Sequence, residues 1–319
     1  MTEMPSAKGF LAAHPVGVYT CARCVPGTDA QLRVLQWRFH IERLALGLAM
    51  DKRFEDNSIS DELLRTLESV TTSLKASLLQ AQHDSPAAGR HGMLTVLWTC
   101  DEQHQINIHA HLCAMPQITL DDAVSVLVHG APRLRPQCKH SQWIADRQPL
   151  EQHMRHVQQA LVPQLKLSEC VLHDDIGRLF EGLITNFFVV LDGAIHTAPS
   201  DGVLPGSTRA QVLAACEALQ IPVVLNAPRL DELQRWSAAF LTSMDILTCC
   251  DGFLSSLTML SSGCVRILQP VNNVVRVSDD GQSLLSMFAV PTTGDGADLV
   301  RRIRSHIQDV PMGQARAIR

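Results

Sequence analysis

One short segment constrains the fold of this chain more than any other. Residues 187–191 read Phe-Phe-Val-Val-Leu, residues 194–197 read Ala-Ile-His-Thr, and Asp192-Gly193 stands between them. Two apolar, β-prone runs joined by Asp-Gly are the strongest short-range signal for a hairpin, because Asp and Gly tolerate the positive φ angles of a two-residue turn. We therefore expect an antiparallel strand pair in the second half of the chain.

Length and composition limit the class of protein. The chain has 319 residues, 46% of them hydrophobic, which suggests about two domains of ~150 residues each. A net charge of −5 gives no electrostatic footprint for nucleic acid. No window approaches the ~20 apolar residues of a membrane helix, and the N-terminus lacks the apolar run of a signal peptide. We expect a cytoplasmic protein that binds neither membrane nor nucleic acid.

The cysteines do not form a recognisable metal or disulfide pattern. Cys21 and Cys24 have the spacing of a zinc knuckle, but no matching second pair follows. We interpret the ten cysteines as reduced, small apolar residues and predict no metal site.

Hydrophobic periodicity divides the rest of the chain into helices and strands. In the first half it predicts strands over residues 16–25, 94–99 and 106–112, helices over 40–50 and from about 60 to 78, and a loop over 85–92. In the second half it predicts an extended connection over 130–137, helices over 149–162 and 297–306 and one beginning after Gly206, and strands over 239–243 and 265–271. This mixture indicates an α/β protein.

Four features could carry chemistry, and each also has an ordinary structural interpretation. His109 and His111 share the polar face of one predicted strand, so they could line a pocket or face solvent. Ser207-Thr208 follow Gly206 at a predicted helix start, which is either a phosphate cradle or a simple cap.

The other two features are single charged residues in apolar surroundings. Glu181 precedes the hairpin and could pair with a buried cation such as a protonated pyridine nitrogen, or lie at an exposed strand end. Lys139, one of only five lysines, could be a reactive amine or a solvated side chain.

The order of these features along the chain resembles the class IV pyridoxal-phosphate aminotransferases, which include branched-chain and D-amino-acid transaminases and aminodeoxychorismate lyase. The resemblance rests on motifs in the family's order: Gly17-Val18-Tyr19, His40-Ile41-Glu42-Arg43-Leu44, Lys139, Glu181-Gly182-Leu183-Ile184-Thr185-Asn186, Asp192-Gly193, Thr197-Ala198-Pro199, and Leu204-Pro205-Gly206-Ser207-Thr208-Arg209. These motifs cover nearly the whole chain.

The resemblance implies a two-domain fold type IV enzyme. The expected parts are a smaller N-terminal α/β domain over residues 1–130, a linker over 131–138, and a larger C-terminal domain over 139–319 with a mixed, barrel-like sheet. It further implies a homodimer, with the cofactor pyridoxal 5′-phosphate bound between the domains.

The resemblance also implies roles for individual residues. Lys139 would form the Schiff base and act as the catalytic base, and Glu181 would keep the pyridine nitrogen protonated. Arg43, Ser207 and Thr208 would bind the phosphate. Tyr19 would lie near the substrate carboxylate, and the position of His109 and His111 in relatives favours the pocket interpretation; Asn186 would fix the hairpin.

Three departures from the family pattern keep alternatives open. Thr20 occupies the place of a glutamate in many transaminases and, with Lys139-His140, resembles the lyase. Residues 244–263 form an insertion between two predicted strands, and the N-terminus is short. The expected reaction is transfer of an amino group from an amino acid to a 2-oxo acid; the alternatives are a lyase of the aminodeoxychorismate type or a catalytically weak binding protein.

Overall fold

The computed structural model describes residues 6–26, 32–51, 65, 69, 72–73, 76–77, 92–102, 106–114, 123–243, 267–278 and 280–309. These residues divide into two units. The first takes in those of Met1–Gln117 and Gln137–Asp146, and the second those of Ile118–Pro136 and Arg147–Pro311. The second unit thus begins before the expected boundary at residue 130, and the segment that carries Lys139 belongs to the first unit.

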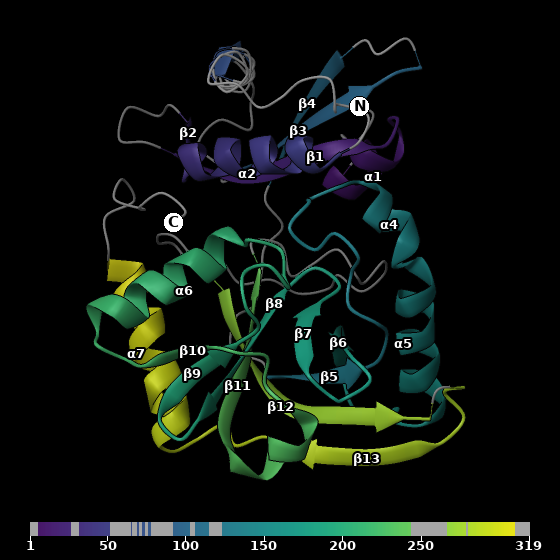
Figure 1. Cartoon of the computed structure of the whole chain (residues 1–319), viewed down its shortest axis with the longest axis vertical. Coiled ribbons are helices and arrows are strands. Elements are labelled where there is room, and N and C mark those ends of the chain that lie inside the picture. Colours follow the sequence, from purple (N-terminus) through teal and green to yellow (C-terminus); the bar gives the residue numbers. More distant parts are fainter. Residues whose placement is uncertain are drawn as a thin grey trace. The chain divides into compact units, whose positions relative to one another are not determined.

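The first unit is built on a four-stranded antiparallel sheet (Figure 1). Its strands lie in the order β2-β1-β3-β4, with the bounds β1 Gly17–Pro26, β2 Leu32–Val34, β3 Gly92–Cys100 and β4 Ile106–Ala114. Its helices are α1 Ala7–Ala12, α2 Trp37–Met50 and α4 Gln142–Asp146. The strands predicted over 16–25, 94–99 and 106–112 and the helix over 40–50 are confirmed. The described residues between 60 and 78 are helical, whereas the loop predicted over 85–92 lies outside the described residues except for Gly92.

The two faces of this sheet pack against different helices, α2 on one face and α1 on the other. Val18, Trp98 and Ile108 lie side by side in the register and pack in one cluster with Leu44 of α2. Their neighbours along each strand point to the opposite face, because successive residues alternate. That opposite face includes the row Tyr19, Leu97 and His109, and α1 packs against it through β3 and β4.

The second unit contains a closed ring of six strands. β8 Asn186–Leu191 pairs with β11 Trp236–Ser243, β11 with β12 Ile267–Val277, and β12 with β5 Val124–Val128; β5 continues to β6 Leu167–His173 and β7 Leu179–Gly182, which pairs back with β8. β5 pairs in parallel with β6 and β12, and the other pairs in the ring are antiparallel. The expected mixed, barrel-like sheet is confirmed.

Two predicted connections can be compared directly with the structure. β8 and β9 (Ala194–Thr197) form the predicted hairpin, with positive φ angles of 50° at Asp192 and 75° at Gly193. β11 and β12 are antiparallel neighbours with Ser243 opposite Ile267. The insertion at 244–263 lies outside the described residues.

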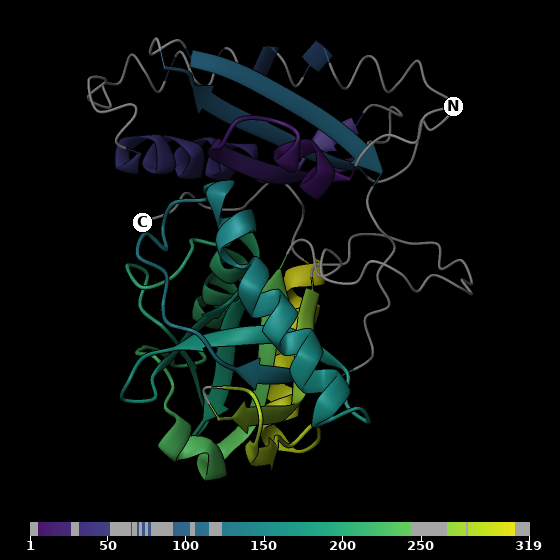
Figure 2. The ribbon, with the colours of Figure 1, turned by 90° about the vertical axis from the view of Figure 1, so that its right-hand side faces the viewer.

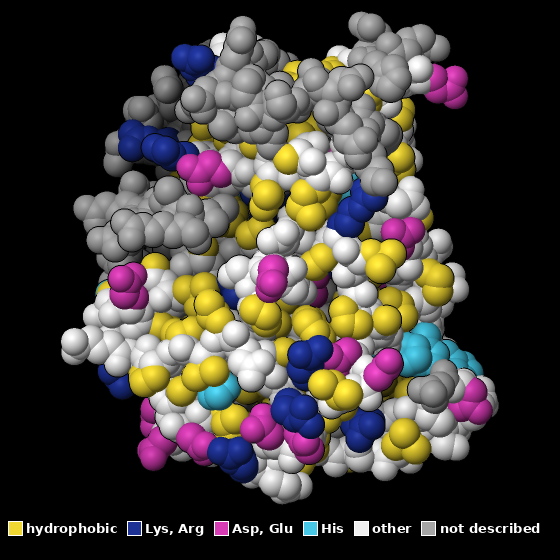
Figure 3. Space-filling model, in the orientation of Figure 1, with side chains coloured by type: hydrophobic (Ala, Val, Ile, Leu, Met, Phe, Trp, Pro, Cys, Tyr) yellow, Lys and Arg dark blue, Asp and Glu magenta, His cyan; other side chains and the backbone are white. Residues whose placement is uncertain are grey.

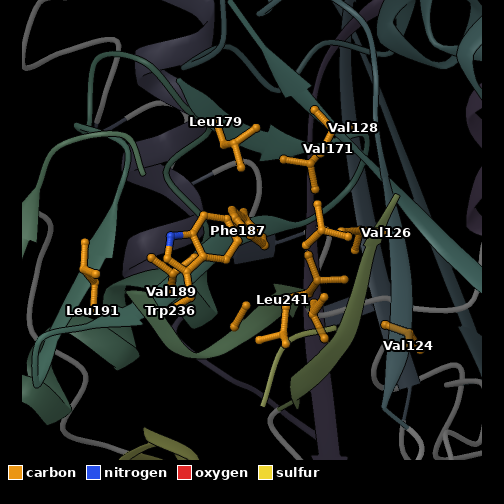
Figure 4. Close-up of a cluster of buried hydrophobic side chains, with 14 residues drawn as sticks. Val124, Val126, Val128, Val171, Leu179, Phe187, Val189, Leu191, Trp236 and Leu241 are labelled. Carbon is orange, nitrogen blue, oxygen red and sulfur yellow. The ribbon is translucent and has the colours of Figure 1, made fainter. Parts of the chain in front are cut away.

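Apolar side chains fill the ring. Phe187, Val189 and Leu191 of β8 point inward to meet Trp236, Leu241 and valines of β5 (Figure 4). The alternate residues Phe188 and Val190 point outward and are covered by α6 (Ser207–Ala218) and α7 (Asp295–Asp309). Because both faces of β8 are buried, its sequence is continuously apolar rather than alternating.

Further helices and edge strands complete the second unit. Helix α5 (Gln148–Ala160) packs on β6 and runs along another side of the ring (Figure 2). The helices predicted over 149–162, after Gly206 and over 297–306 are confirmed, and residues 130–137 contain neither helix nor strand. The remaining elements of this unit are β10 Val223–Leu225, β13 Leu284–Ala289 and a 3-10 turn over Leu230–Arg235.

Two general properties of the described residues bear on possible partners. None of the helices they form has the length and apolar character needed to cross a membrane. On the face shown in Figure 3, acidic and basic side chains are interspersed rather than separated by sign.

Candidate functional site

In the first unit, the backbone around Lys139 is held against the edge of β1. The Tyr19 N–H donates to the Lys139 carbonyl at 2.9 Å, and the Ser141 N–H donates to the Gly17 carbonyl at 2.8 Å. The Gly17 N–H in turn donates to Ser141 Oγ at 2.9 Å. These contacts place the Lys139 Nζ 4.9 Å from the centre of the Tyr19 ring. Two predicted site residues that are 120 positions apart in sequence are therefore neighbours.

Both sequence neighbours of Lys139 are anchored to the C-terminal end of α2. Cys138 Sγ contacts the Gly47 carbonyl at 3.5 Å, and His140 Nε2 lies 3.2 Å from a carboxylate oxygen of Asp51. A side chain at Gly47 would meet Val18, since an added Cβ would lie 2.5 Å from Val18 Cγ1. Helix α2 and β1 thus hold the lysine segment from two sides.

Arg43 reaches the same stretch of β1 from α2. Its Nη2 donates to Thr20 Oγ1 at 2.8 Å and lies 3.3 Å from His40 Nδ1. Thr20 Oγ1 is also 2.9 Å from His40 Nδ1. Since an arginine can only donate, His40 Nδ1 accepts here and the imidazole proton lies on Nε2.

His40 is fully buried, and its pKa is held well below the ordinary value. Burial is the largest cause, and the positive charges of Arg43 and Lys139 act in the same direction. His40 is therefore neutral and serves as an acceptor. Tyr19 and Thr20 are consecutive on β1, so Lys139 and Arg43 contact neighbouring residues of one strand.

His109 and His111 lie on the same sheet face as Tyr19, beneath α1. The His111 ring stacks on Phe10 at 4.9 Å, and the His109 ring is 4.5 Å from that of His14. Burial lowers the pKa of both histidines, with a further contribution from His14. The structure thus packs His111 against α1 and His109 against His14, which follows that helix.

In the second unit, Glu181 is buried and paired rather than at an exposed strand end. Only 3% of its surface is exposed. Its Oε2 accepts the Leu204 N–H at 2.9 Å, and its Oε1 lies 3.4 Å from Arg133 Nη1. A buried carboxylate with these partners can hold a positive group, such as a protonated ring nitrogen, beside it.

Asn186 binds the other backbone polar group of Leu204. Its Nδ2 donates to the Leu204 carbonyl at 2.9 Å. Its Oδ1 would lie 2.2 Å from a Cβ added to Gly206, so Gly206 allows a close approach that another residue would prevent. Glu181 and Asn186 pair across β7 and β8, so this hairpin holds the segment that leads into α6.

Helix α6 begins at Ser207, directly after this segment. Gly206, its N-cap, supplies no side-chain hydrogen bond, and Ser207 and Thr208 are buried at 4% and 7% exposure. The first N–H groups of a helix lack intrahelical partners and carry a partial positive charge. Together with two hydroxyls, this end of α6 has a donor set that suits a phosphate.

Arg209 fixes the first turn of α6 to the loop after β9. Its Nη2 donates to the Ala198 carbonyl at 2.9 Å, and its Nη1 lies 3.4 Å from Ser200 Oγ. Burial lowers the pKa of Arg209, and the negative charge of Glu181 partly offsets that effect.

Three residues around these sites were given no role of their own in the sequence analysis. His40 lies three positions before Arg43, a helical spacing that could have revealed their contact. Arg133 and Glu169, a buried carboxylate on β6, carry no local signal because their partners lie 14 to 48 positions away. Among the described residues, no group of three or more His, Cys, Asp or Glu side chains is arranged to hold a metal ion.

Comparisons with known proteins match this chain to a sequence family and to solved structures. The sequence profile of the amino-transferase class IV family matches residues 17–246. A search of curated protein sequences found no significant match.

Solved structures share the fold at low sequence identity. A fold IV transaminase from Curtobacterium pusillum is 16% identical with a TM-score of 0.63, covering 92% of this chain and 87% of its own. A branched-chain aminotransferase from Thermoproteus uzoniensis with norvaline is 15% identical, with a TM-score of 0.58 and coverages of 92% and 85%. A hypothetical aminotransferase from Mycobacterium tuberculosis in its PLP-bound form is 15% identical, with a TM-score of 0.57 and coverages of 96% and 94%.

Proposed function

This chain belongs to the class IV amino-transferase family, and from that premise we propose that it is a pyridoxal-phosphate-dependent aminotransferase. The proposed reaction moves an amino group from an amino acid to a 2-oxo acid. The observation that carries the proposal is the position of Lys139, whose backbone pairs with β1 and whose Nζ faces Tyr19, with Arg43 bonded to the adjacent Thr20. When bound, pyridoxal phosphate supplies an electron sink for the electron pair released at the substrate Cα.

The residues of the first unit would bind the substrate and move its proton. Lys139 would hold the cofactor through its Nζ and, with substrate bound, would accept and return the proton of the substrate Cα. Arg43 donates to phosphate oxygens. Tyr19 orients the substrate carboxylate. A substrate contact for His109 and His111 remains a prediction, because the His111 ring packs on Phe10 and the His109 ring on His14.

The residues of the second unit would hold the two ends of the cofactor. Glu181 keeps a proton on the pyridine nitrogen, because its buried negative charge stabilises the positive ring. Ser207 and Thr208 bind the phosphate with their hydroxyls and with the first N–H groups of α6. We also propose, from the family resemblance, that the protein is a homodimer, which light scattering would test.

Substitution of the lysine tests the proposal. Purified protein mixed with pyridoxal phosphate is expected to show a visible absorbance band that Lys139→Ala abolishes, because Lys139 is the lysine proposed to bind the cofactor aldehyde. Lys166→Ala, at an exposed lysine of the second unit, is the matched control and should keep the band. A Lys139→Ala protein that retains the wild-type band would refute the assignment.

A lyase of the aminodeoxychorismate type is the second candidate. It is favoured by Thr20, which provides a neutral hydroxyl to Arg43 where many transaminases carry a glutamate. Pyruvate release from aminodeoxychorismate without any 2-oxo acid would identify the lyase. Turnover of an amino donor, tested with D- and L-alanine and L-leucine, only when a 2-oxo acid is present would identify the transaminase. Cofactor binding without either turnover would identify a binding protein.

A further inference from the structure

A buried carboxylate outside the proposed cofactor contacts holds the hairpin that carries Glu181. We propose that Glu169 is a positioning residue: it fixes the β7–β8 turn and thereby the placement of Glu181 and of the N-terminus of α6. This inference rests on the proposed function for its catalytic meaning, but its structural content can be tested without the cofactor.

The contacts of Glu169 are almost all with that turn. The side chain lies on β6 and is 1% exposed. Its Oε1 accepts the N–H groups of Cys170 at 2.9 Å and Leu183 at 3.0 Å. Its Oε2 accepts the Ile184 N–H at 3.3 Å and the Thr185 hydroxyl at 2.9 Å. Three of the four donors therefore come from the connection between β7 and β8.

The turn is shaped to receive this side chain. A Cβ added to Gly182 would lie 2.5 Å from Glu169 Cγ and Cδ and 2.3 Å from Thr185 Oγ1. The Glu169 side chain thus occupies the space where a residue other than glycine would place its side chain. The turn is closed beneath it by the Gly182 N–H, which donates to the Thr185 carbonyl at 2.9 Å.

The choice of a carboxylate has a physical reason. Burial raises the pKa of Glu169, so placing it here is unfavourable, and its four hydrogen bonds offset that cost. An ionised carboxylate offers acceptor sites on two oxygens, whereas glutamine offers one oxygen and a donating NH2 group. Glutamine would set its NH2 group against N–H donors of the turn, so only a carboxylate satisfies all four groups.

The β7–β8 turn is linked to the proposed cofactor residues by a short series of backbone and side-chain contacts. The turn joins Glu181 directly to Asn186, and these two residues pair across the strands. Glu181 accepts the Leu204 N–H and Asn186 donates to the Leu204 carbonyl. Helix α6 starts three residues later, at Ser207. A shift of the turn therefore moves both the carboxylate and the helix N-terminus.

Hydrogen exchange of the cofactor-free protein tests this link. In Glu169→Gln, the amides of Leu183, Ile184 and Leu204 are all expected to exchange faster, because weakening the turn releases the Leu204 peptide. Glu151→Gln is the matched control, since Glu151 is also a buried carboxylate, on α5, and is paired with Arg147 at 2.8 Å. Faster exchange at Leu183 and Ile184 with unchanged exchange at Leu204 would overturn the proposal.

Cofactor titration provides the second readout. Glu169→Gln is expected to weaken pyridoxal phosphate binding about tenfold, the size of effect when one hydrogen bond to a charged group is lost. It should also shift the pH midpoint of the visible band, which a general loss of stability would not move. Equal effects of Glu169→Gln and Glu151→Gln would refute a positioning role.

A milder variant keeps the test usable if Glu169→Gln does not fold. Thr185→Val removes only one of the four donors and should give a smaller change of the same sign in Leu204 exchange; no change would count against the proposal. Failure of the wild type to bind pyridoxal phosphate would refute the proposed function, while the exchange experiment would still decide the role of Glu169.

Discussion

At the scale of single residues, the neutral His40 shows how a buried polar group depends on its surroundings. Its Nδ1 accepts from Thr20 and Arg43, and its pKa is lowered well below the ordinary value of 6.5 by burial and by the charges of Arg43 and Lys139. The unfolded chain binds a proton at this histidine near pH 6.5, whereas the folded protein does not. Folding is therefore linked to pH through this one group.

The sign of that linkage gives a prediction for stability. The folded-state pKa of His40 is depressed, so its contribution to the free energy of unfolding is fully present above about pH 6.5. As the pH falls below that value, the free energy of unfolding decreases by at most about 1.4 kcal/mol per pH unit through this group. His40→Gln keeps an acceptor but cannot titrate, so thermal melts of the cofactor-free variant from pH 8 to 5 should fall less steeply than those of wild type. His156→Gln, at an exposed histidine, is the control; identical slopes for wild type and His40→Gln would contradict the prediction.

At the scale of elements, the contact between the β7–β8 hairpin and the start of α6 depends on one glycine. The backbone of Gly206 has an ordinary φ of −77°, so it is the close approach of Asn186 Oδ1, and not a left-handed conformation, that excludes a larger residue. The Asn186 side chain cannot simply withdraw, because its Nδ2 holds the Leu204 carbonyl.

This geometry predicts coupling between two substitutions. Gly206→Ala is expected to destabilise the protein by about 1–3 kcal/mol, because the added methyl group displaces Asn186. In an Asn186→Ala background the clash is absent, so Gly206→Ala should lower the free energy of unfolding by less. Urea unfolding of the wild type, both single variants and the double variant measures this difference; strictly additive free energies would contradict it.

At the scale of the whole molecule, the ring of the second unit brings together distant parts of the chain. β5 pairs with β12, whose first described residue lies more than 130 positions later, and β7 pairs back with β8 to close the ring. Its interior is filled by side chains from these strands, with Phe187 packed 5.9 Å from Trp236 (Figure 4).

Because the ring interior is filled by side chains, we expect a cavity there to lower the free energy of unfolding substantially. Phe187→Ala should lower the free energy of unfolding of the second unit by about 3–5 kcal/mol, because the site is completely buried and cannot collapse easily. Leu285→Ala on β13, where the side chain is 60% exposed, should change it by less than about 0.5 kcal/mol. Comparable losses for the two variants in chemical denaturation would show that the ring does not carry the stability of this unit.

Much of the fold could be predicted from sequence because its signals are local. Asp192-Gly193 between apolar runs predicts the β8–β9 hairpin, and the 3.6-residue period predicts α2 and α6. The order of motifs around Lys139 and Glu181 indicates the family without any knowledge of contacts. The contact of Lys139 Nζ with the Tyr19 ring and the burial of Glu181 could not be predicted from local signals, because each depends on a segment from elsewhere in the chain.

The sequence by itself determined the elements, the family and the short set of chemically competent residues, because propensity and periodicity act over a few neighbouring positions. Only the tertiary structure decided which strands close the ring, that Glu181 is buried against Arg133 and Leu204, and that His40 is neutral. It also brought Glu169 to a turn 14 positions away in the chain. Burial and hydrogen-bond pairing are set by distant segments that displace water together, so no local pattern encodes them.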